Sequence, residues 1–309
     1  EGSGRCWGAE MKMAVVGHRI WFANHYPERW RGDPDVKCLD VSEADYSWLM
    51  ALANWHPDVT LFYRPELYPE RFLRHIGGIR VAFLTEPLPV LSGKRLKTTA
   101  ESALRLAVYK RMAWDAYHRR LYYDRGRAGT AGFLKWPIDD YRPMPIDTAL
   151  FRPPRLGTAR PIDLCFVGKA TPYRIGRLEP LRRASASEFV WVAHGFYGAE
   201  LARLFRRSKV VLNVHADGVA AQEPRLYLAA ACGCRVVSEP LPSAPATLRS
   251  WIVEEPRVWT YEVLQEHLAA WATQRWTSTD EAERLALGVR RLLTDEWGRS
   301  SGEASTPRV

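Results

Sequence analysis

The sequence predicts an α/β protein with two Rossmann-like domains that face each other across a cleft. Short apolar runs alternate with amphipathic stretches along most of the 309 residues, and this alternation is typical of parallel strands joined by helices. A Pro-rich segment at residues 136–154 interrupts the alternation once, after which it starts again. Because Pro fits neither a helix interior nor a central strand, we expect this segment to connect two domains.

The first half contains four predicted strands and three predicted helices. The expected strands are residues 13–16, 36–41, 59–63 and 79–84, and the expected helices are residues 44–55, 68–76 and 98–117. The His56–Pro57 pair is a stop signal for the first helix, and Gly77–Gly78 is one for the second. Residues 1–10 differ in character from the rest of the chain, so we exclude them from the predicted domain, residues 11–145.

The second half repeats the same rhythm. Its expected strands are residues 163–167, 189–193, 210–214 and 235–238, and its expected helices are residues 174–186, 198–207, 224–231 and 260–293. We place the second domain at residues 146–275. Residues 276–309 would then form a C-terminal helix and a loose tail, and whether this helix crosses back to the first domain is left open.

The composition is that of a folded protein with a basic balance. A hydrophobic content of 47% excludes wholesale disorder, and no apolar run reaches the ~18 residues that predict a transmembrane helix. The net charge is +9, and most of the 44 basic residues are Arg. Two interpretations of this excess stay open: a general compositional bias, or contact with anionic partners, since the guanidinium fork suits phosphate and carboxylate.

The cysteines argue against a metal site and against a disulfide framework. There are five, an odd number, and their spacing matches no zinc pattern. Cys232 and Cys234 lie in an apolar stretch and are expected to be buried structural thiols. We therefore expect a reducing, cytoplasmic location and no bound metal.

The predicted helix at residues 98–117 adds a question about membranes. Its apolar residues Leu104, Val108, Met112 and Tyr117 fall near one face, and basic residues such as Arg105 lie beside them. Such a helix suits either an anionic membrane surface or a charged acceptor, and an ordinary solvated face is the third interpretation. Peripheral membrane contact is thus one of the expectations.

Ligands of open parallel sheets bind beyond the carboxyl ends of the strands. This rule selects a set of polar residues and glycines in each half. In the first half they are His18, Arg19, Arg64, Glu66 and Glu86, and in the second half Gly168, Lys169, His194, Gly195, His215, Asp217 and Glu239.

Three segments resemble family 4 glycosyltransferases, which have the B-type fold. PIDTALFRP at residues 145–153 is similar to the segment that crosses between the two domains of that family. IDLCFVGKATPYRIGRL at residues 162–178 resembles the strand and Gly-containing loop that face the donor diphosphate. VVLNVHADGVAAQEPRLYLAAACGCRVV at residues 210–237 resembles the donor-binding strand, loop and helix, and is most similar to the spore-maturation-protein-B-like branch.

The resemblance implies a transferase that moves a sugar from a nucleoside-diphosphate sugar to an acceptor hydroxyl, with retention and without a metal or other cofactor. The donor would lie on the second domain, and a small-molecule, glycan or lipid-linked acceptor on the first. The donor-binding residues that it implies are Gly168, Lys169, Arg174, His194, Gly195, His215, Glu223 and Arg225. His18, Glu86 and Asp217 are the catalytic candidates, as a base, an acceptor contact and a sugar contact.

One family feature is missing from the third segment. The family has two Glu eight positions apart, the second of which is expected to hold the donor ribose, and this chain has Ala220 and Leu228 there. Asp217 or Glu223 would have to replace that contact.

Three other functions stay open. A nucleic-acid-binding or nucleic-acid-modifying protein would suit the basic and aromatic composition, although the Arg are dispersed and no nucleic-acid motif occurs. A non-catalytic member of the fold would suit the missing Glu pair. A sugar-nucleotide epimerase shares the B-type fold, although its usual catalytic carboxylates are not evident.

Overall fold

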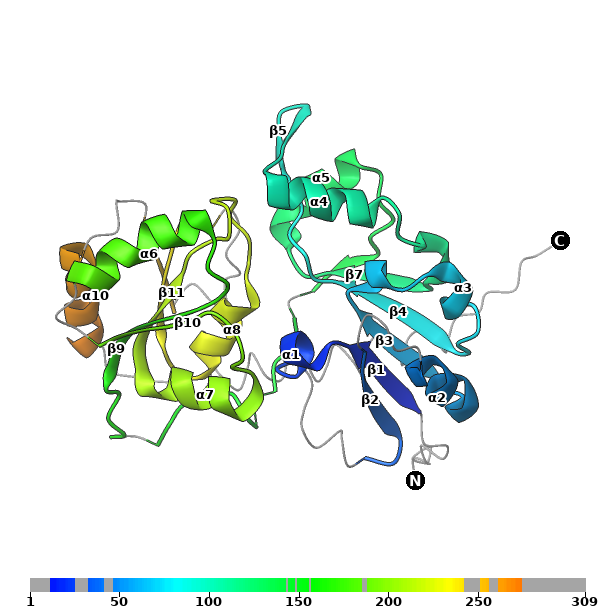
Figure 1. Ribbon diagram of the computed structural model, residues 1–309, viewed down its shortest axis with the longest axis horizontal. Helices are drawn as coiled ribbons and strands as arrows, with labels where there is room; N and C mark the ends of the chain where they lie inside the picture. The colour runs from blue at the N-terminus through cyan, green and yellow to red at the C-terminus, as the bar shows by residue number, and fades with distance from the viewer. Residues whose placement is uncertain are drawn as a thin grey trace, which may run out of the picture. The chain divides into compact units, whose positions relative to one another are not determined.

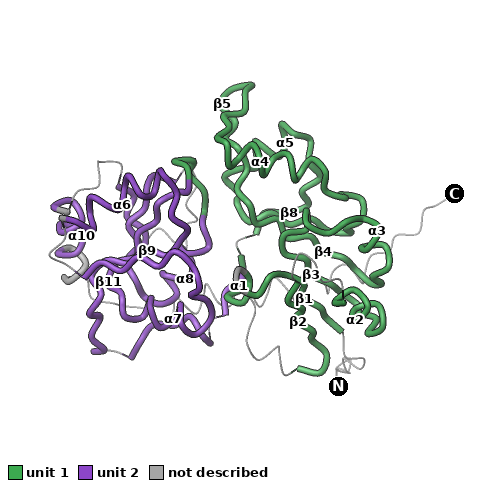
Figure 2. Tube along the Cα trace, in the orientation of Figure 1, with its two compact units in different colours: residues 1–144, 217–222 green, residues 145–216, 223–309 purple. Residues whose placement is uncertain are grey.

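The computed structural model describes residues 12–25, 33–41, 47–142, 144–147, 149–155, 157–184, 188–241, 251–255 and 261–273. The chain forms two compact units (Figures 1 and 2). Unit 1 comprises residues 1–144 and 217–222, and unit 2 comprises residues 145–216 and 223–309. The division after Met144 lies within the Pro-rich segment, whereas nothing in the sequence indicated that residues 217–222 would join unit 1.

Unit 1 contains a parallel sheet of six strands. In chain order they are β1 (Met13–Gly17), β2 (Val36–Asp40), β3 (Val59–Tyr63), β4 (Ile79–Leu84), β7 (Arg119–Tyr122) and β8 (Asp140–Tyr141). Their order in the sheet is β2-β1-β3-β4-β7-β8, and every pairing between neighbours is parallel. Helices and turns join the strands: α1 (Arg19–Phe22), α2 (Ser47–Trp55), η2 (Pro65–Leu67), α3 (Glu70–Leu73), α4 (Ala100–Tyr109), η3 (Trp114–Ala116), η4 (Arg125–Arg127) and α5 (Ala128–Phe133).

Unit 2 contains a parallel sheet of five strands. They are β9 (Ile162–Val167), β10 (Phe189–Val192), β11 (Ser208–Asn213), β12 (Arg235–Ser238) and β13 (Ile252–Glu254), in the order β10-β9-β11-β12-β13. Its helices are α6 (Pro172–Ala184), α7 (Gly198–Arg207), α8 (Pro224–Ala231) and α10 (Tyr261–Thr273). Counted within each unit, the first five strands follow the same order, 2-1-3-4-5, so the prediction of two Rossmann-like domains is confirmed.

Helices cover both faces of the unit 2 sheet. Side chains alternate between the faces along each strand, so Leu164 and Cys165 belong to different cores. α7 and α8 pack on the face with Cys165, and α6 and α10 pack on the face with Leu164 (Figure 1). A strand buried on both faces must be apolar throughout, which explains the continuous apolar runs in the sequence.

Several elements differ from the expected ones. The helix expected at residues 98–117 ends at Tyr109, and the one expected at residues 68–76 is only the four-residue α3. Several elements were not expected at all: the antiparallel hairpin of β5 (Val90–Ser92) with β6 (Arg95–Lys97), and also α1, β7, α5, β8 and β13. Residues 1–10 and 276–309 lie outside the described residues.

Two further expectations concern membranes and thiols. In the part of the chain that the structure describes, no helix has the length and apolar character needed to span a membrane. Cys165, Cys232 and Cys234 are buried free thiols, and Cys38 is a half-buried one. Burial raises the pKa of Cys165 to about 12 and that of Cys234 to about 11, so these groups are inert structural thiols, as the sequence suggested.

Candidate functional site

The topology of unit 2 has its switch point between the ends of β9 and β11. These two strands are neighbours in the sheet, although β10 lies between them in sequence. The chain leaves β9 for α6 on one face and later leaves β11 for α8 on the other face. Connections that run to opposite faces leave open space between the two strand ends, which is where open α/β sheets bind ligands.

Two buried arginines lie at this point and stack on the same aromatic ring. Arg174 comes from the first turn of α6 and Arg225 from the first turn of α8. The guanidinium carbon of Arg174 is 5.2 Å from the centroid of the Phe166 ring, and that of Arg225 is 4.8 Å from it. Phe166 is fully buried in β9, so the ring is a fixed platform for both groups.

Backbone carbonyls at the strand ends fix the orientation of both guanidinium groups. Arg225 donates from Nη1 to the carbonyl oxygen of Val167 at 2.6 Å. Arg174 donates from Nε to Val214 at 3.0 Å and from Nη1 to Lys169 at 3.1 Å. The two arginines thus bind the chain directly after β9 and β11.

The two guanidinium groups share the carboxylate of Glu223. Glu223 lies between the arginines, 3.5 Å from Nη2 of Arg225 and 3.9 Å from Nη2 of Arg174. Burial lowers the pKa of Arg225 to about 10; Glu223 opposes this shift and the nearby Arg174 adds to it. The Nε atom of Arg225 is buried without a hydrogen-bond partner among the described residues. The buried Nε atom of Arg225 is therefore a donor that a further anion could bind.

Gly168 makes room for the pair. A Cβ atom at this position would lie 2.9 Å from Nη1 of Arg225 and 3.2 Å from Nη1 of Arg174. The Gly168 backbone is held in place, because its N–H donates to Val192 and its carbonyl oxygen accepts from the Trp191 indole. Both arginines can approach the strand end only because this residue has no side chain.

His215 and Glu239 complete the same edge of the sheet. Both are buried, and the carboxylate of Glu239 accepts the backbone N–H of His215 at 2.9 Å and the hydroxyl of Tyr173 at 2.6 Å. Arg177 lies 3.6 Å from the same carboxylate. Burial lowers the pKa of His215, and the carboxylates of Glu223 and Glu239 oppose this shift, so the imidazole is neutral near pH 7.

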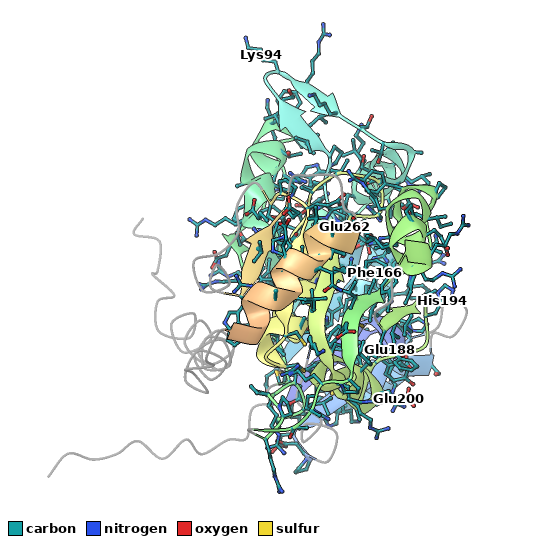
Figure 3. The ribbon with its side chains drawn as sticks, turned by 90° about the vertical axis from the view of Figure 1, so that its left-hand side faces the viewer. Lys94, Phe166, Glu188, His194, Glu200 and Glu262 are labelled. Carbon is teal, nitrogen blue, oxygen red and sulfur yellow. The ribbon has the colours of Figure 1, made fainter. Side chains whose placement is uncertain are left out.

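The structure brings some of the predicted donor residues together and separates others from them. Gly168, Arg174, His215, Glu223 and Arg225 form one cluster. The side chain of Lys169 is exposed, and only its backbone carbonyl contacts Arg174. His194 and Gly195 are exposed and follow β10, the edge strand of the sheet, whereas Phe166 belongs to the interior strand β9 (Figure 3).

The three catalytic candidates lie in unit 1, each with partners of its own. His18 follows β1 with its Nδ1 atom 3.9 Å from the carboxylate of Asp40. Glu86 follows β4 and pairs with Arg64 and Arg105. Asp217 belongs to the segment that joins unit 1, and its carboxylate accepts a hydrogen bond from the Thr99 hydroxyl. The Asp217 carboxylate therefore binds the residue that caps the N-terminus of α4.

Neither of the two positions at which the family has Glu offers a side chain that could replace the carboxylate expected to hold the donor ribose. Leu228 is buried within α8, and Ala220 lies in the segment of unit 1, where its carbonyl accepts from Arg127. Glu223 is engaged with the two arginines. Among the described residues, no group of three or more His, Cys, Asp or Glu side chains is arranged to hold a metal ion.

The comparison with protein families supports glycosyl transfer in general terms. Residues 177–297 match one family model, described as glycosyl transferase-like. The matched region includes α8 with Arg225 and the third of the three resembling segments, but it does not distinguish the spore-maturation-protein-B-like branch. Nucleic-acid binding is not favoured by this match.

Comparisons with individual proteins add little. No curated protein matches the chain. Among solved structures, UDP-GlcNAc 2-epimerase from Methanocaldococcus jannaschii is 9% identical with a TM-score of 0.48, covering 93% of this chain and 100% of that one. The DNA-modifying β-glucosyltransferase is 10% identical with a TM-score of 0.42, covering 94% and 97%. Spinosyn forosaminyltransferase SpnP is 14% identical with a TM-score of 0.42, covering 95% and 99%. At these values the similarity transfers neither a substrate nor a residue to this chain.

The sequence did not indicate every residue of this site. The strand-end rule found Glu239, but neither Phe166 nor Tyr173 carried a signal, because an aromatic residue in a strand is indistinguishable from ordinary core. Arg225, in contrast, was recognisable in the sequence. A basic residue in the first turn of a helix opposes the helix dipole, so helix stability does not explain why an Arg is there.

Proposed function

We propose that the chain transfers a sugar from a nucleoside-diphosphate sugar to an acceptor hydroxyl, with Arg174 and Arg225 holding the donor diphosphate. The observation that carries this proposal is the buried arginine pair at the switch point of unit 2. Two guanidinium groups, one shared carboxylate and a buried Nε atom without a partner among the described residues form a site for a strong anion. The family match over residues 177–297 supports the reaction class.

The same arrangement suits the chemistry of the leaving group. In the transfer, the bond between the anomeric carbon and the diphosphate oxygen breaks while the acceptor oxygen forms a bond to that carbon. The acceptor proton passes to a phosphate oxygen of the departing nucleoside diphosphate. Negative charge grows on this group in the transition state, and guanidinium groups already fixed by backbone carbonyls stabilise it without having to reorganise.

The proposal has three further parts: the anomeric configuration of the product, the independence from metal, and the kind of acceptor. Retention of the anomeric configuration rests on the family 4 resemblance alone. Independence from metal rests on that resemblance, together with the two guanidinium groups, which would supply the positive charge that a cation otherwise provides. The acceptor is proposed to be a small molecule, a glycan or a lipid-linked glycan that binds through unit 1.

The proposal is tested by donor turnover. The chain is incubated with UDP-, GDP-, dTDP- and CDP-sugars and a pool of acceptors, and release of the nucleoside diphosphate is measured. We expect turnover of one donor class and about a 100-fold loss of rate in Arg225→Lys, because Lys keeps the charge but not the stacked fork. Arg182→Lys on the exposed side of α6 is the matched control and should turn over donor like the wild type.

Two results would contradict the proposal. One is that no donor is turned over and no nucleoside diphosphate binds, which would favour a non-catalytic protein of this fold. The other is turnover that Arg225→Lys leaves unchanged, which would place the donor elsewhere. If transfer occurs, NMR of the product anomer distinguishes retention from inversion, and turnover in the presence of EDTA tests the need for a metal.

A further inference from the structure

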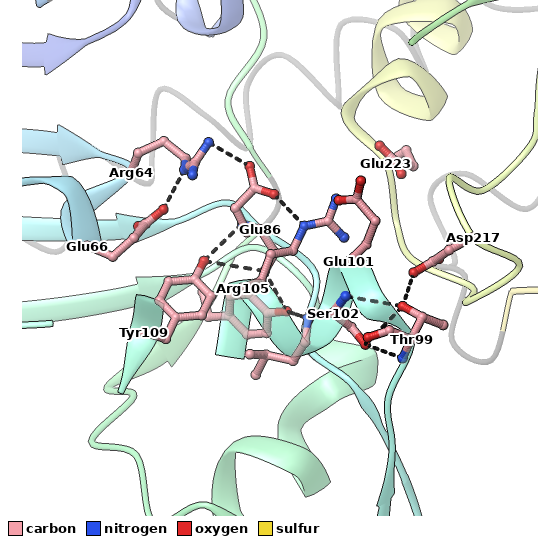
Figure 4. A network of polar contacts seen from close by, with 12 residues as sticks. Arg64, Glu66, Glu86, Thr99, Glu101, Ser102, Arg105, Tyr109, Asp217 and Glu223 are labelled. Carbon is pink, nitrogen blue, oxygen red and sulfur yellow. Dashed lines mark hydrogen bonds and ion pairs between the residues drawn. The ribbon is translucent and has the colours of Figure 1, made fainter. Parts of the chain in front are cut away.

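Unit 1 contains a pocket of about 280 Å³ at the carboxyl ends of β3 and β4 (Figure 4). Its volume is just below the ~300–1,000 Å³ of ordinary small-molecule sites, so it would hold a ligand of about one ring. Charged and apolar side chains line it together. The charged ones include Arg64, Glu66, Glu86 and Arg105, and the apolar ones are Leu104 and Val108.

The walls of this pocket are held by buried tyrosines. The hydroxyl of Tyr117 donates to the carbonyl of Pro65 at 2.8 Å, and that of Tyr68 donates to Tyr63 at 3.1 Å, which fixes the loop after β3. Tyr109 accepts the backbone N–H of Glu86 at 3.0 Å. All three tyrosines are buried, so the charged side chains of the pocket stand on a rigid support.

The charged side chains form a chain of alternating sign (Figure 4). Glu86 lies between two arginines, 3.0 Å from Nη1 of Arg64 and 2.9 Å from Nε of Arg105. Arg64 also donates to Glu66, and Arg105 lies 3.3 Å from Glu101. Because donors and acceptors are side by side, a ligand of a single charge would be repelled by one group wherever another attracts it.

One atom of the network has no partner within it. The side chain of Glu66 is only 2% exposed, and its Oε2 atom is buried without a hydrogen bond among the described residues. Burial raises the pKa of Glu66, although Arg64 opposes the shift. Leaving a buried carboxyl oxygen without a hydrogen bond is unfavourable, so a ligand group that donates to this atom would satisfy it.

The backbone of Arg64 supports a functional interpretation of the network. Arg64 has φ of 54° and ψ of 55°, a left-handed conformation that is unfavourable for any residue other than Gly. Such a conformation persists only where the surroundings impose it, and here it directs the side chain toward both Glu66 and Glu86.

An apolar surface borders these charges. Leu104 is 68% exposed although it is a large apolar residue on α4, and Val108 lies one turn further along the same helix. The buried face of α4 is formed instead by Ser102, Leu106 and Tyr109. Leu104 and Val108 line the pocket, whereas Met112 and Tyr117, which were expected on the same helix face, lie beyond the end of α4.

We propose that this pocket binds a neutral, polyhydroxylated ring such as a single sugar unit. A hydroxyl group donates and accepts, so it can bond to Glu66 and to a neighbouring guanidinium at once. The carbon face of the ring would pack on Leu104 and Val108. The use of this pocket as the acceptor site rests on the proposed function, whereas the binding of a sugar does not.

The test is binding of free sugars to the whole chain without any nucleotide. Saturation-transfer NMR and calorimetry are run with glucose, galactose, mannose, rhamnose, N-acetylglucosamine and glucosamine. We expect at least one neutral sugar to bind in a saturable way. Glu66→Gln should weaken it at least fivefold, and Leu104→Ser, at an exposed position where folding is not at risk, should weaken it as well. Glu70→Gln on exposed α3 is the matched control and should bind like the wild type.

Three outcomes would overturn the inference. One is that no sugar binds saturably. Another is binding that neither Glu66→Gln nor Leu104→Ser weakens, which would locate the sugar elsewhere. The third is preference for glucosamine over its neutral counterparts, which would make this a cation site. Binding of UDP, GDP, dTDP and CDP is measured on the same variants and should not change, so failure here is distinguishable from failure of the donor proposal.

Discussion

Gly168 is the residue on which both buried guanidinium groups converge, so it offers a direct perturbation of the donor site. In Gly168→Ala the new methyl group would press on Nη1 of Arg225 and of Arg174. We expect nucleoside-diphosphate affinity to fall about tenfold, because both forks must move from the carbonyls that orient them. Calorimetry with the nucleotide that binds the wild type measures the change.

Gly176→Ala is the matched control in α6. Nothing lies within 4 Å of a Cβ atom there, and the residue is exposed within the helix. The substitution should leave nucleotide affinity unchanged and raise the free energy of unfolding by about 0.5–1 kcal/mol, since Ala is the better helix former. Equal affinity in the two variants would contradict the convergence of both arginines on Gly168.

His215 gives the donor site a pH signature in stability. Its pKa is lowered from 6.5 in the folded chain, mainly by burial. Below about pH 6.5 the unfolded chain therefore binds a proton that the folded chain does not, so the free energy of unfolding falls as the pH decreases. His215→Gln removes this contribution. We expect the stability of the wild type relative to this variant to decrease from pH 7.5 to pH 5.5 in denaturant titrations.

A constant difference between wild type and His215→Gln across this pH range would show that the two states bind the His215 proton equally.

Some residues of the two sites could be predicted from the sequence and others could not. Arg174, Glu223 and Arg225 were predicted from the resemblance, and strand ends alone indicated Glu66, Glu86 and Glu239. Phe166 and Arg105 could not be predicted in their roles, because each depends on the direction of a side chain in the folded chain. Asp217 was expected as a sugar contact in the second half, but its segment belongs to unit 1, which no local pattern indicates.

The helix α4 begins at a polar cap that can be tested separately. Thr99 accepts from the backbone N–H of Ser102, and Ser102 accepts from the backbone N–H of Thr99, a reciprocal capping box. Thr99 also donates to Asp217. Thr99→Ala should lower the free energy of unfolding by about 1 kcal/mol, within a range of ~0.5–2 kcal/mol. Chemical denaturation measures it, and exposed Thr98→Ala should change it by less than ~0.5 kcal/mol. Equal losses in both variants would contradict a role for the cap.

The elements that were predicted wrongly share a physical cause. The apolar pattern continues from α4 to Tyr117, but the helix ends at Tyr109, where the Trp114 indole donates to the Tyr109 carbonyl. Tyr117 is buried for a different reason, its bond to Pro65. The hairpin of β5 and β6 is short and polar, so it has no apolar alternation to indicate it. Tertiary contacts decided these cases, whereas the buried strands were predictable because their apolar runs are continuous.

At the scale of the whole molecule, the two units repeat one strand order around separate cores. A ligand that binds the arginine pair should therefore protect unit 2 first. We expect bound nucleoside diphosphate to slow hydrogen exchange in residues 162–184 and 223–231, which carry the contacts of the pair. Protection confined to unit 1 would contradict this assignment.

Many arginines contribute to the net charge of +9, and the structure distinguishes those that form ion pairs from those at the proposed donor site. Many arginines are consumed in internal pairs, such as Arg120 with Asp139 and Arg64 with Glu86. The arginines that carry the proposed function are Arg174 and Arg225, which are buried and share the carboxylate of Glu223.

The most direct test of the account is calorimetric binding of UDP, GDP, dTDP and CDP to the wild type and to Arg225→Lys, with circular dichroism to show that the variant is folded. We predict that at least one nucleotide binds the wild type and raises its stability by about 2.7 kcal/mol at 100 times its dissociation constant. Arg225→Lys should lose at least tenfold in affinity for that nucleotide. A folded wild type that binds none of the four, or a variant with undiminished affinity, would contradict the central claim.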